Sequence, residues 1–116
     1  YSFFDQGFNL ISQADSTLFF TPLPQKYGLM QNFPNPFNPL TSIRFELPTM
    51  TYVILQVYDV GGRLIDKLAD ATFEPGVHHV IWDGKDLKGR DVSSGIYFYQ
   101  IFTSDFTKTN KMVLVK

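Results

Sequence analysis

The stretch from Val53 to Ile65 constrains the fold more than any other part of the chain. It begins with the apolar run Val-Ile-Leu-Gln-Val-Tyr and continues through Asp-Val-Gly-Gly-Arg into a second apolar pair. Side chains alternate between the faces of a strand, and both faces of this run carry apolar groups, as in a central strand of a sandwich. Asp59 can cap the turn, and Gly61 and Gly62 accept the positive φ angles of a tight reversal. We therefore predict a β-hairpin.

Further strand signals recur about every ten residues. Thr41–Leu47 alternates cleanly between apolar and polar residues, which predicts a half-buried strand that pairs with the strand at Val53 as an antiparallel hairpin. Arg63–Ala69 also fits a helical face, but the preceding turn favours a strand. Three other segments have strand composition: Val77–Trp82, Ile96–Phe102 and Thr107–Lys116. These signals predict an all-β fold, an antiparallel immunoglobulin-like or fibronectin III-like β-sandwich of about seven strands with Trp82 in its core.

Composition narrows the classes of function. The 116 residues contain no cysteine, which excludes disulfides, thiolate zinc sites and thiol nucleophiles. Ten basic and eleven acidic residues, with no basic run, argue against a nucleic-acid partner. The sequence also lacks a motif for acyl transfer. We expect no catalytic, cofactor-binding or metal site, and the protein is predicted not to be an enzyme.

The chain divides into two parts of different character. Residues 1–28 are aromatic but lack sustained periodicity, and we interpret them as a linker or the end of a preceding domain. The alternative is that Leu18–Phe20 docks as an extra edge strand. Residues 29–116 form the predicted sandwich domain.

The segment Gln31–Pro39 contains three prolines, which withhold hydrogen-bond donors and exclude a helix or a central strand. Phe33 and Phe37 are available to pin this segment over an apolar surface. We predict a structural lid over one end of the sandwich, and the alternative is a proline-rich ligand for another domain.

Three groups of residues could carry chemistry. His78 and His79 are adjacent on a predicted strand, so they point to opposite faces and cannot share a ligand. The carboxylates of the 83–91 loop could bind calcium or cap turns, and the turn-capping interpretation is favoured because the spacing fails the EF-hand pattern. Strand tyrosines could stack on sugars, but packing is the more common role.

Five short motifs occur in a characteristic order. They are Gln31–Pro39, Val57–Arg63, Trp82–Gly84 with Gly89, Ser94–Tyr97 and Lys111–Lys116. Together they resemble the C-terminal sorting domain, type A, of the type IX, or Por, secretion system, over about residues 29–116. The same region is similar to the immunoglobulin-like domain of the flagellar hook-capping protein, and a flagellar assembly scaffold is a third, less favoured hypothesis.

This resemblance implies a sorting function. Members of the family direct a preceding cargo protein through an outer-membrane translocon, and a sortase-like surface peptidase then removes the domain while the cargo is attached to the cell surface. The residues implied in recognition are Gly62, Arg63, Lys111, Met112, Val113, Leu114, Val115 and Lys116. The residues of the structural motifs are Asn35, Pro36, Phe37, Asn38, Pro39, Trp82, Asp83, Gly84, Gly95 and Tyr97.

This sorting function implies that the protein is exported to the periplasm and is then secreted or displayed at the cell surface. The last strand is expected to expose an edge that a partner could grasp, and a weak homodimer through that edge is an alternative to a monomer. The alternative function is a structural spacer or carbohydrate-binding β-sandwich attached to a secreted glycoside hydrolase.

Overall fold

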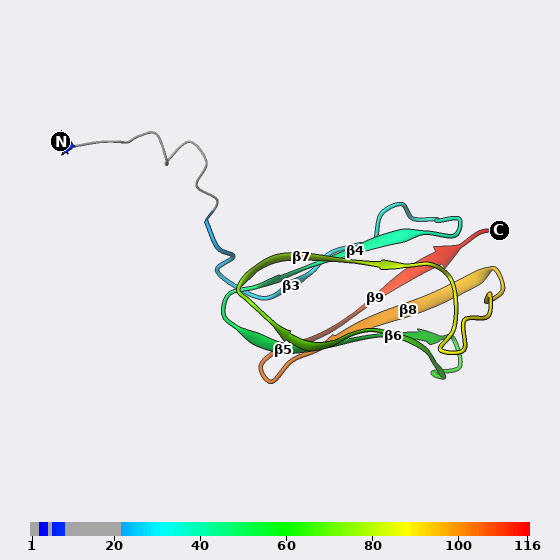
Figure 1. Cartoon of the computed structure of the whole chain (residues 1–116). Coiled ribbons are helices and arrows are strands. Elements are labelled where there is room, and N and C mark those ends of the chain that lie inside the picture. The colour runs from blue at the N-terminus through cyan, green and yellow to red at the C-terminus, as the bar shows by residue number, and fades with distance from the viewer. Residues whose placement is uncertain (1–2, 5, 9–21) are drawn as a thin grey trace.

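The computed structural model describes residues 3–4, 6–8 and 22–116. Seven strands from Gly28 onward form two antiparallel sheets that face each other as a sandwich (Figure 1). Near the N-terminus, β1 (Phe3–Phe4) pairs with β2 (Gln6–Phe8). The edge strand considered at Leu18–Phe20 lies outside the described residues. No helix in the described part of the chain is long and apolar enough to cross a membrane.

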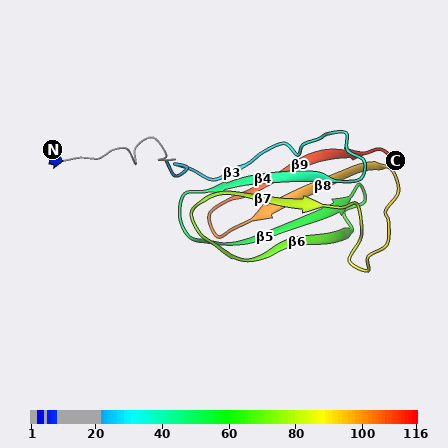
Figure 2. The same ribbon diagram turned by 45° about the horizontal axis from the view of Figure 1, so that its top comes forward.

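The two sheets contain three and four strands. The first has the order β3-β4-β7, with β3 at Gly28–Leu29, β4 at Thr41–Leu47 and β7 at Gly76–Trp82. The second has the order β6-β5-β8-β9, with β6 at Leu64–Phe73, β5 at Thr51–Asp59, β8 at Gly95–Phe102 and β9 at Thr107–Leu114. Figure 1 shows the two layers, and Figure 2 shows the sandwich from a second direction in which their strands overlap. The predicted all-β sandwich is confirmed.

The hairpin predicted from Val53 to Ile65 is present as β5 and β6. β5 lies between β6 and β8, and the side chains of Val53, Leu55 and Val57 are fully buried. The prediction for the two turn glycines is half right. Gly62 has a φ of +84°, whereas Gly61 does not adopt a positive φ.

The predicted pairing of β4 with β5 is wrong. β4 pairs instead with β7, in a register that runs from Thr41 opposite Trp82 to Leu47 opposite Gly76. The apolar faces of β4 and β5 must both be buried, and in a sandwich they achieve this by facing each other from opposite sheets. Pro48, which cannot donate to a strand ladder, ends β4 before the chain crosses to the second sheet.

The core is built from the inward side chains of both sheets. Trp82 is the largest residue in it and has no exposed surface, as predicted. Its indole Nε1 donates a hydrogen bond to the carbonyl of Lys85 at 2.9 Å. Its ring lies 5.6 Å from that of Phe37 and 5.4 Å from that of Tyr97. Trp82 thus joins the first sheet, the proline-rich segment and the second sheet.

Candidate functional site

Most of the motifs meet at one end of the sandwich. The strand register of the second sheet places Asp59 opposite Tyr97 and Gly95 opposite Leu114. The turn after β5, the loop before β8 and the residues after β9 therefore lie at the same end, on the right in Figure 1. We call this end the motif end, and it comprises residues 60–63, 83–94 and 114–116.

The Gly-Arg turn is organised by Asp59, which caps it as predicted. One carboxylate oxygen of Asp59 accepts hydrogen bonds from the backbone N–H groups of Gly61 and Arg63, both at 2.9 Å. The other oxygen lies 3.2 Å from Nε of Arg63. The backbone N–H of Arg63 lowers the pKa of the Asp59 carboxyl below its usual range. The N–H of Gly61 and the Arg63 guanidinium lower this pKa further. The Arg63 side chain is nevertheless 81% exposed, so its charge is offered to solvent.

The terminal strand divides the predicted recognition residues into two groups. Met112 and Leu114 are buried in the core, with at most 1% of each exposed. Lys111 and Lys116 are exposed, and the amide N–H of Lys116 donates to the hydroxyl of Ser94 at 3.0 Å. Only part of this strand can therefore contact a partner while the domain is folded.

The proline-rich segment lies along the outer edge of β9. The amide of Phe37 donates to the carbonyl of Val113 at 3.0 Å, and the amide of Val115 donates to the carbonyl of Phe37 at 2.9 Å. The side-chain oxygen of Asn35 accepts from the amide of Val113 at 2.9 Å. The edge that the sequence predicts to be exposed is thus covered over this half of β9, because residues 35–37 substitute for a neighbouring strand.

The two phenylalanines of this segment have different roles. Phe37 is 2% exposed and packs on Trp82, whereas Phe33 is 79% exposed. The prediction that both rings pin the segment is therefore right for Phe37 and wrong for Phe33. The remaining motif residues of the segment are exposed: Asn35, Pro36, Asn38 and Pro39.

A buried polar network anchors the start of the segment, and sequence reasoning missed it. The hydroxyl of Tyr99 accepts from the amide of Asn32 at 2.8 Å and donates to the carbonyl of Met30 at 2.6 Å. Asn110 also donates to this hydroxyl, at 3.3 Å. Burial raises the pKa of Tyr99. The signal in the sequence that could have revealed this network is Tyr99 itself. It lies on a predicted core strand, and a buried tyrosine hydroxyl needs a hydrogen-bond partner.

The Trp-Asp-Gly and Ser-Gly-Ile-Tyr motifs serve the fold. Asp83 accepts from the amide of Lys85 at 3.2 Å, and Gly84 has a φ of +75°, which favours glycine. Tyr97 is 6% exposed and donates its hydroxyl to the carbonyl of Ser93 at 2.7 Å. These residues shape the loop that forms most of the motif end, and Gly95 begins β8.

The other candidate chemistries have local structural explanations. Among the described residues, no three imidazole or carboxylate groups are grouped so that they could hold a metal ion. In the 83–91 loop, Asp86 caps a turn by accepting from the amides of Lys88 and Arg90 at 2.9 and 3.0 Å. His78 packs against Phe45, whereas His79 is exposed on the opposite face.

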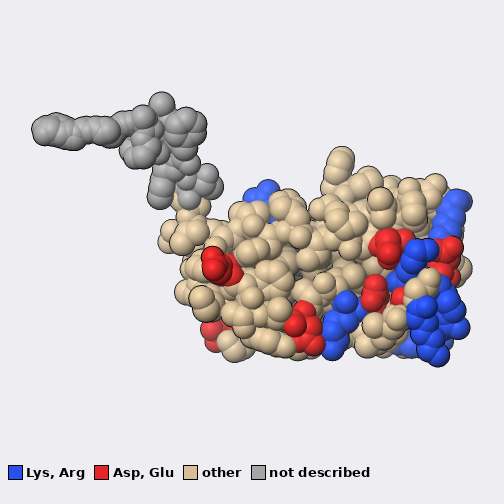
Figure 3. Space-filling view, in the orientation of Figure 1, with Lys and Arg blue, Asp and Glu red and all other residues tan. Residues whose placement is uncertain are grey.

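A cleft of about 730 Å³ opens at the motif end. The Gly-Arg turn forms one side, and residues 86–88 and 90–97 form the other. Figure 3 shows that lysine and arginine side chains gather at this end of the molecule, with acidic side chains among them. Arg63, which the family resemblance implied in recognition, therefore lies beside an open cleft and away from the core.

The fold and the motif end define a class of protein: a small antiparallel β-sandwich that carries most of its sequence motifs at one end. A family model described as "Secretion system C-terminal sorting domain" matches residues 31–116. The chain therefore belongs to this family, and it has a sorting role in type IX secretion. A sorting-signal domain family is not itself catalytic, and secretion or display at the cell surface follows from membership.

Three solved structures share this fold. Dimeric latent PorU from Porphyromonas gingivalis matches with a TM-score of 0.63 and 19% identity over 90% of this chain and 10% of PorU. PorZ, a type IX secretion surface component of the same organism, matches with a TM-score of 0.55 and 20% identity over 74% of this chain and 11% of PorZ. FlgD from P. aeruginosa matches with a TM-score of 0.52 and 28% identity over 64% of this chain and 58% of FlgD.

The chain thus spans about a tenth of the length of the two P. gingivalis proteins. Among curated proteins, no relative matches the chain.

Proposed function

We propose that residues 29–116 direct a preceding cargo protein across the outer membrane by presenting the motif end to the type IX translocon. The observation that carries this proposal is the meeting of the Gly-Arg turn, the 83–94 loop and the chain end at one end of the sandwich. Three segments that are distant in sequence thereby form one surface.

The proposed contact surface is the exposed subset of the predicted recognition residues. It consists of Gly62, Arg63, Val115 and Lys116 at the motif end, and of Lys111 and Val113 on the adjoining part of β9; Val113 is half-buried and the others are exposed. Met112 and Leu114 hold β9 in the core and act on recognition through the fold. Deleting residues 111–116 would remove both buried side chains, so loss of export in that variant would not separate recognition from folding.

The remaining steps of the proposed export are those that the family resemblance implies. Residues 1–28 are proposed to be the linker to the cargo, and a sortase-like surface peptidase is proposed to cut within it after export through the periplasm. The cargo then stays at the cell surface or is released. The domain itself is proposed to have no catalytic activity and to act as a monomer, because residues 35–37 cover the C-terminal half of the edge of β9 through which it would dimerise.

We expect this chain to carry a reporter to the cell surface. The whole chain is fused to the C-terminus of a periplasm-targeted fluorescent protein, and the fusion is expressed in a bacterium that has a type IX system. Surface fluorescence is expected in this strain, and retention in the periplasm is expected when the translocon gene is deleted. Export of the fusion without the translocon would contradict the proposal.

Affinity electrophoresis in polysaccharide gels separates this proposal from the carbohydrate-binding alternative. A sorting domain is expected to migrate unchanged in every gel. Retardation by one polysaccharide, together with periplasmic retention of the reporter, would favour the alternative.

A further inference from the structure

Two loops of the motif end share one sequence pattern, Asp-x-x-Gly-Arg. The first is Asp59–Arg63, the Gly-Arg turn between β5 and β6, and the second is Asp86–Arg90, in the loop between β7 and β8. They belong to connections that differ in length and in the sheets that they join. A shared fold of the connections therefore does not explain the shared pattern.

The two loops also have the same hydrogen bonds. In each, the aspartate carboxylate accepts from the N–H groups two and four residues later, at 2.9 and 2.9 Å in the first loop and 2.9 and 3.0 Å in the second. The aspartate amide donates to the arginine carbonyl, at 3.0 and 2.9 Å. Gly62 and Gly89 have φ angles of +84° and +79°. The same backbone unit thus occurs twice.

This unit turns each arginine outward. The distances from Nε of the arginine to the aspartate carboxylate are 3.2 Å in the first loop and 3.1 Å in the second. The aspartate side chains are only 22% and 20% exposed, while Arg63 and Arg90 are 81% and 70% exposed. Because the contact uses Nε, the far end of each guanidinium, with its two NH₂ groups, is available to a ligand. Within these two pairs the more exposed charge is therefore the positive one. The cleft is also lined by Asp91, which is 67% exposed and is paired with Lys85 at 2.7 Å.

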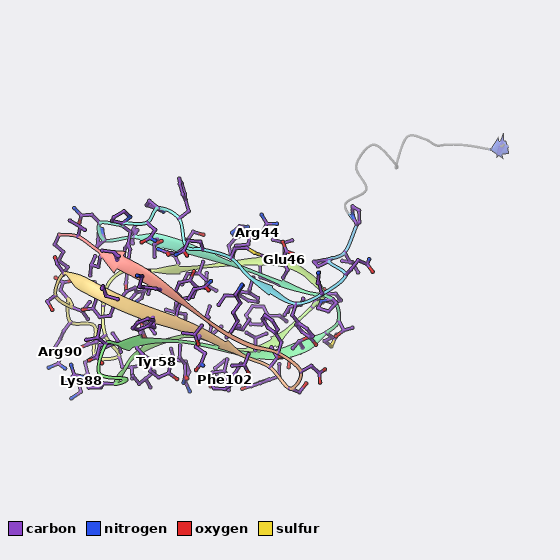
Figure 4. All side chains as sticks on the ribbon, turned by 180° about the vertical axis from the view of Figure 1, so that it is seen from behind. Arg44, Glu46, Tyr58, Lys88, Arg90 and Phe102 are labelled. Atoms are coloured by element: carbon purple, nitrogen blue, oxygen red, sulfur yellow. The ribbon has the colours of Figure 1, made fainter. Side chains whose placement is uncertain are left out.

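Both arginines line the same cleft, together with Lys88. Figure 4 shows Lys88 and Arg90 together at this end of the molecule. Exposed apolar side chains also line the cleft, and they are Val60, Leu64, Leu87 and Ile96, between 37% and 73% exposed. A ligand that fits this lining carries carboxylates for the arginines and apolar side chains for the rest.

We propose that the two Asp-x-x-Gly-Arg loops act as a pair and clasp an acidic peptide segment that also carries apolar residues. This inference rests on the proposed function for the identity of the partner, an exposed segment of the export machinery. It assigns Arg90, in the 83–94 loop of the motif end, a direct contact in recognition. A phosphate or a lipid headgroup fits less well, because neither uses the apolar side chains that lie among the cations.

Fluorescence anisotropy with the whole chain tests the pair directly. The probe is a fluorescein-labelled twelve-residue peptide of alternating Glu and Leu, and a Gln-Leu peptide of the same length is its control. Arg63→Ala and Arg90→Ala are each expected to weaken binding about tenfold or more, because each removes hydrogen bonds between charged groups. Arg44→Ala is the matched control, since Arg44 is also ion-paired and exposed but lies on β4, away from the cleft (Figure 4). It should bind as the wild type does.

A second measurement needs no variant. Binding of the Glu-Leu peptide to the wild-type chain should weaken steeply as salt is raised, and the Gln-Leu peptide should not bind. Equal binding of the two peptides, or wild-type affinity in Arg90→Ala, would overturn the inference. Stronger binding to vesicles of anionic phospholipid than to the peptide would overturn it as well.

The reporter assay keeps the two proposals distinguishable. If the wild-type fusion is exported but Arg90→Ala is exported equally well, the paired-loop inference fails and the sorting function stands. If the wild-type fusion is not exported, the sorting function fails, and the peptide measurement alone decides whether the paired loops bind an acidic segment.

Discussion

Replacing Trp82 by alanine is expected to lower the free energy of unfolding by about 3–5 kcal/mol. The indole has no exposed surface and contacts the rings of Phe37 and Tyr97, so its removal leaves a cavity where three parts of the structure meet. The substitution also leaves the carbonyl of Lys85 without its donor. Urea denaturation followed by circular dichroism measures the change.

Ile81→Ala is the control for this substitution. Ile81 precedes Trp82 on β7 but points to the outer face and is 59% exposed, so the change is expected to stay within about 1 kcal/mol. Similar losses for the two variants would show that the inward and outward faces of β7 are assigned wrongly. The aggregation of a folding-defective Trp82→Ala chain would itself agree with the prediction.

Phe37→Ala is expected to cost about 3–5 kcal/mol, although Phe37 belongs to no long strand. Its ring is 2% exposed against Trp82, and its backbone makes two hydrogen bonds with β9. Without the ring, residues 35–37 lose their anchor, and the edge of β9 becomes open to other chains. We therefore expect concentration-dependent association as well as lower stability, measured by denaturation and by light scattering.

Phe33→Ala provides the comparison within the same segment. Phe33 is 79% exposed, so its replacement should leave stability within about 0.5 kcal/mol of the wild type. A monomeric and stable Phe37→Ala variant would show that the proline-rich segment does not protect the edge of β9.

The strands were predictable because one face of each is buried. Alternation with a period of two identified β4 and placed Ile43 and Phe45 in the core, whereas strand composition identified β7, which carries Trp82. The partner of β4 was not predictable from this pattern. A strand with one apolar face fits equally beside β5 in one sheet or opposite β5 in the other, and only the packing of the whole core decides between them.

Less of the candidate site could be predicted, because it depends on contacts between distant residues. The family resemblance pointed to Arg63 and to β9, but the hydrogen bond between Asn35 and Val113 joins residues 78 positions apart. No local pattern reports such a contact. The repeated Asp-x-x-Gly-Arg pattern was present in the sequence, yet its importance is clear only once both loops line one cleft.

The central claim is that the motif end is recognised for export. It is tested most directly by measuring the export of a reporter fusion that carries Arg63→Ala. The 81% exposed side chain of Arg63 supports no core residue, so the variant should unfold at the same urea concentration as the wild type within error. The account predicts that the folded variant accumulates in the periplasm while the Arg44→Ala fusion reaches the cell surface. Normal surface display of Arg63→Ala, or loss of its fold, would contradict the account.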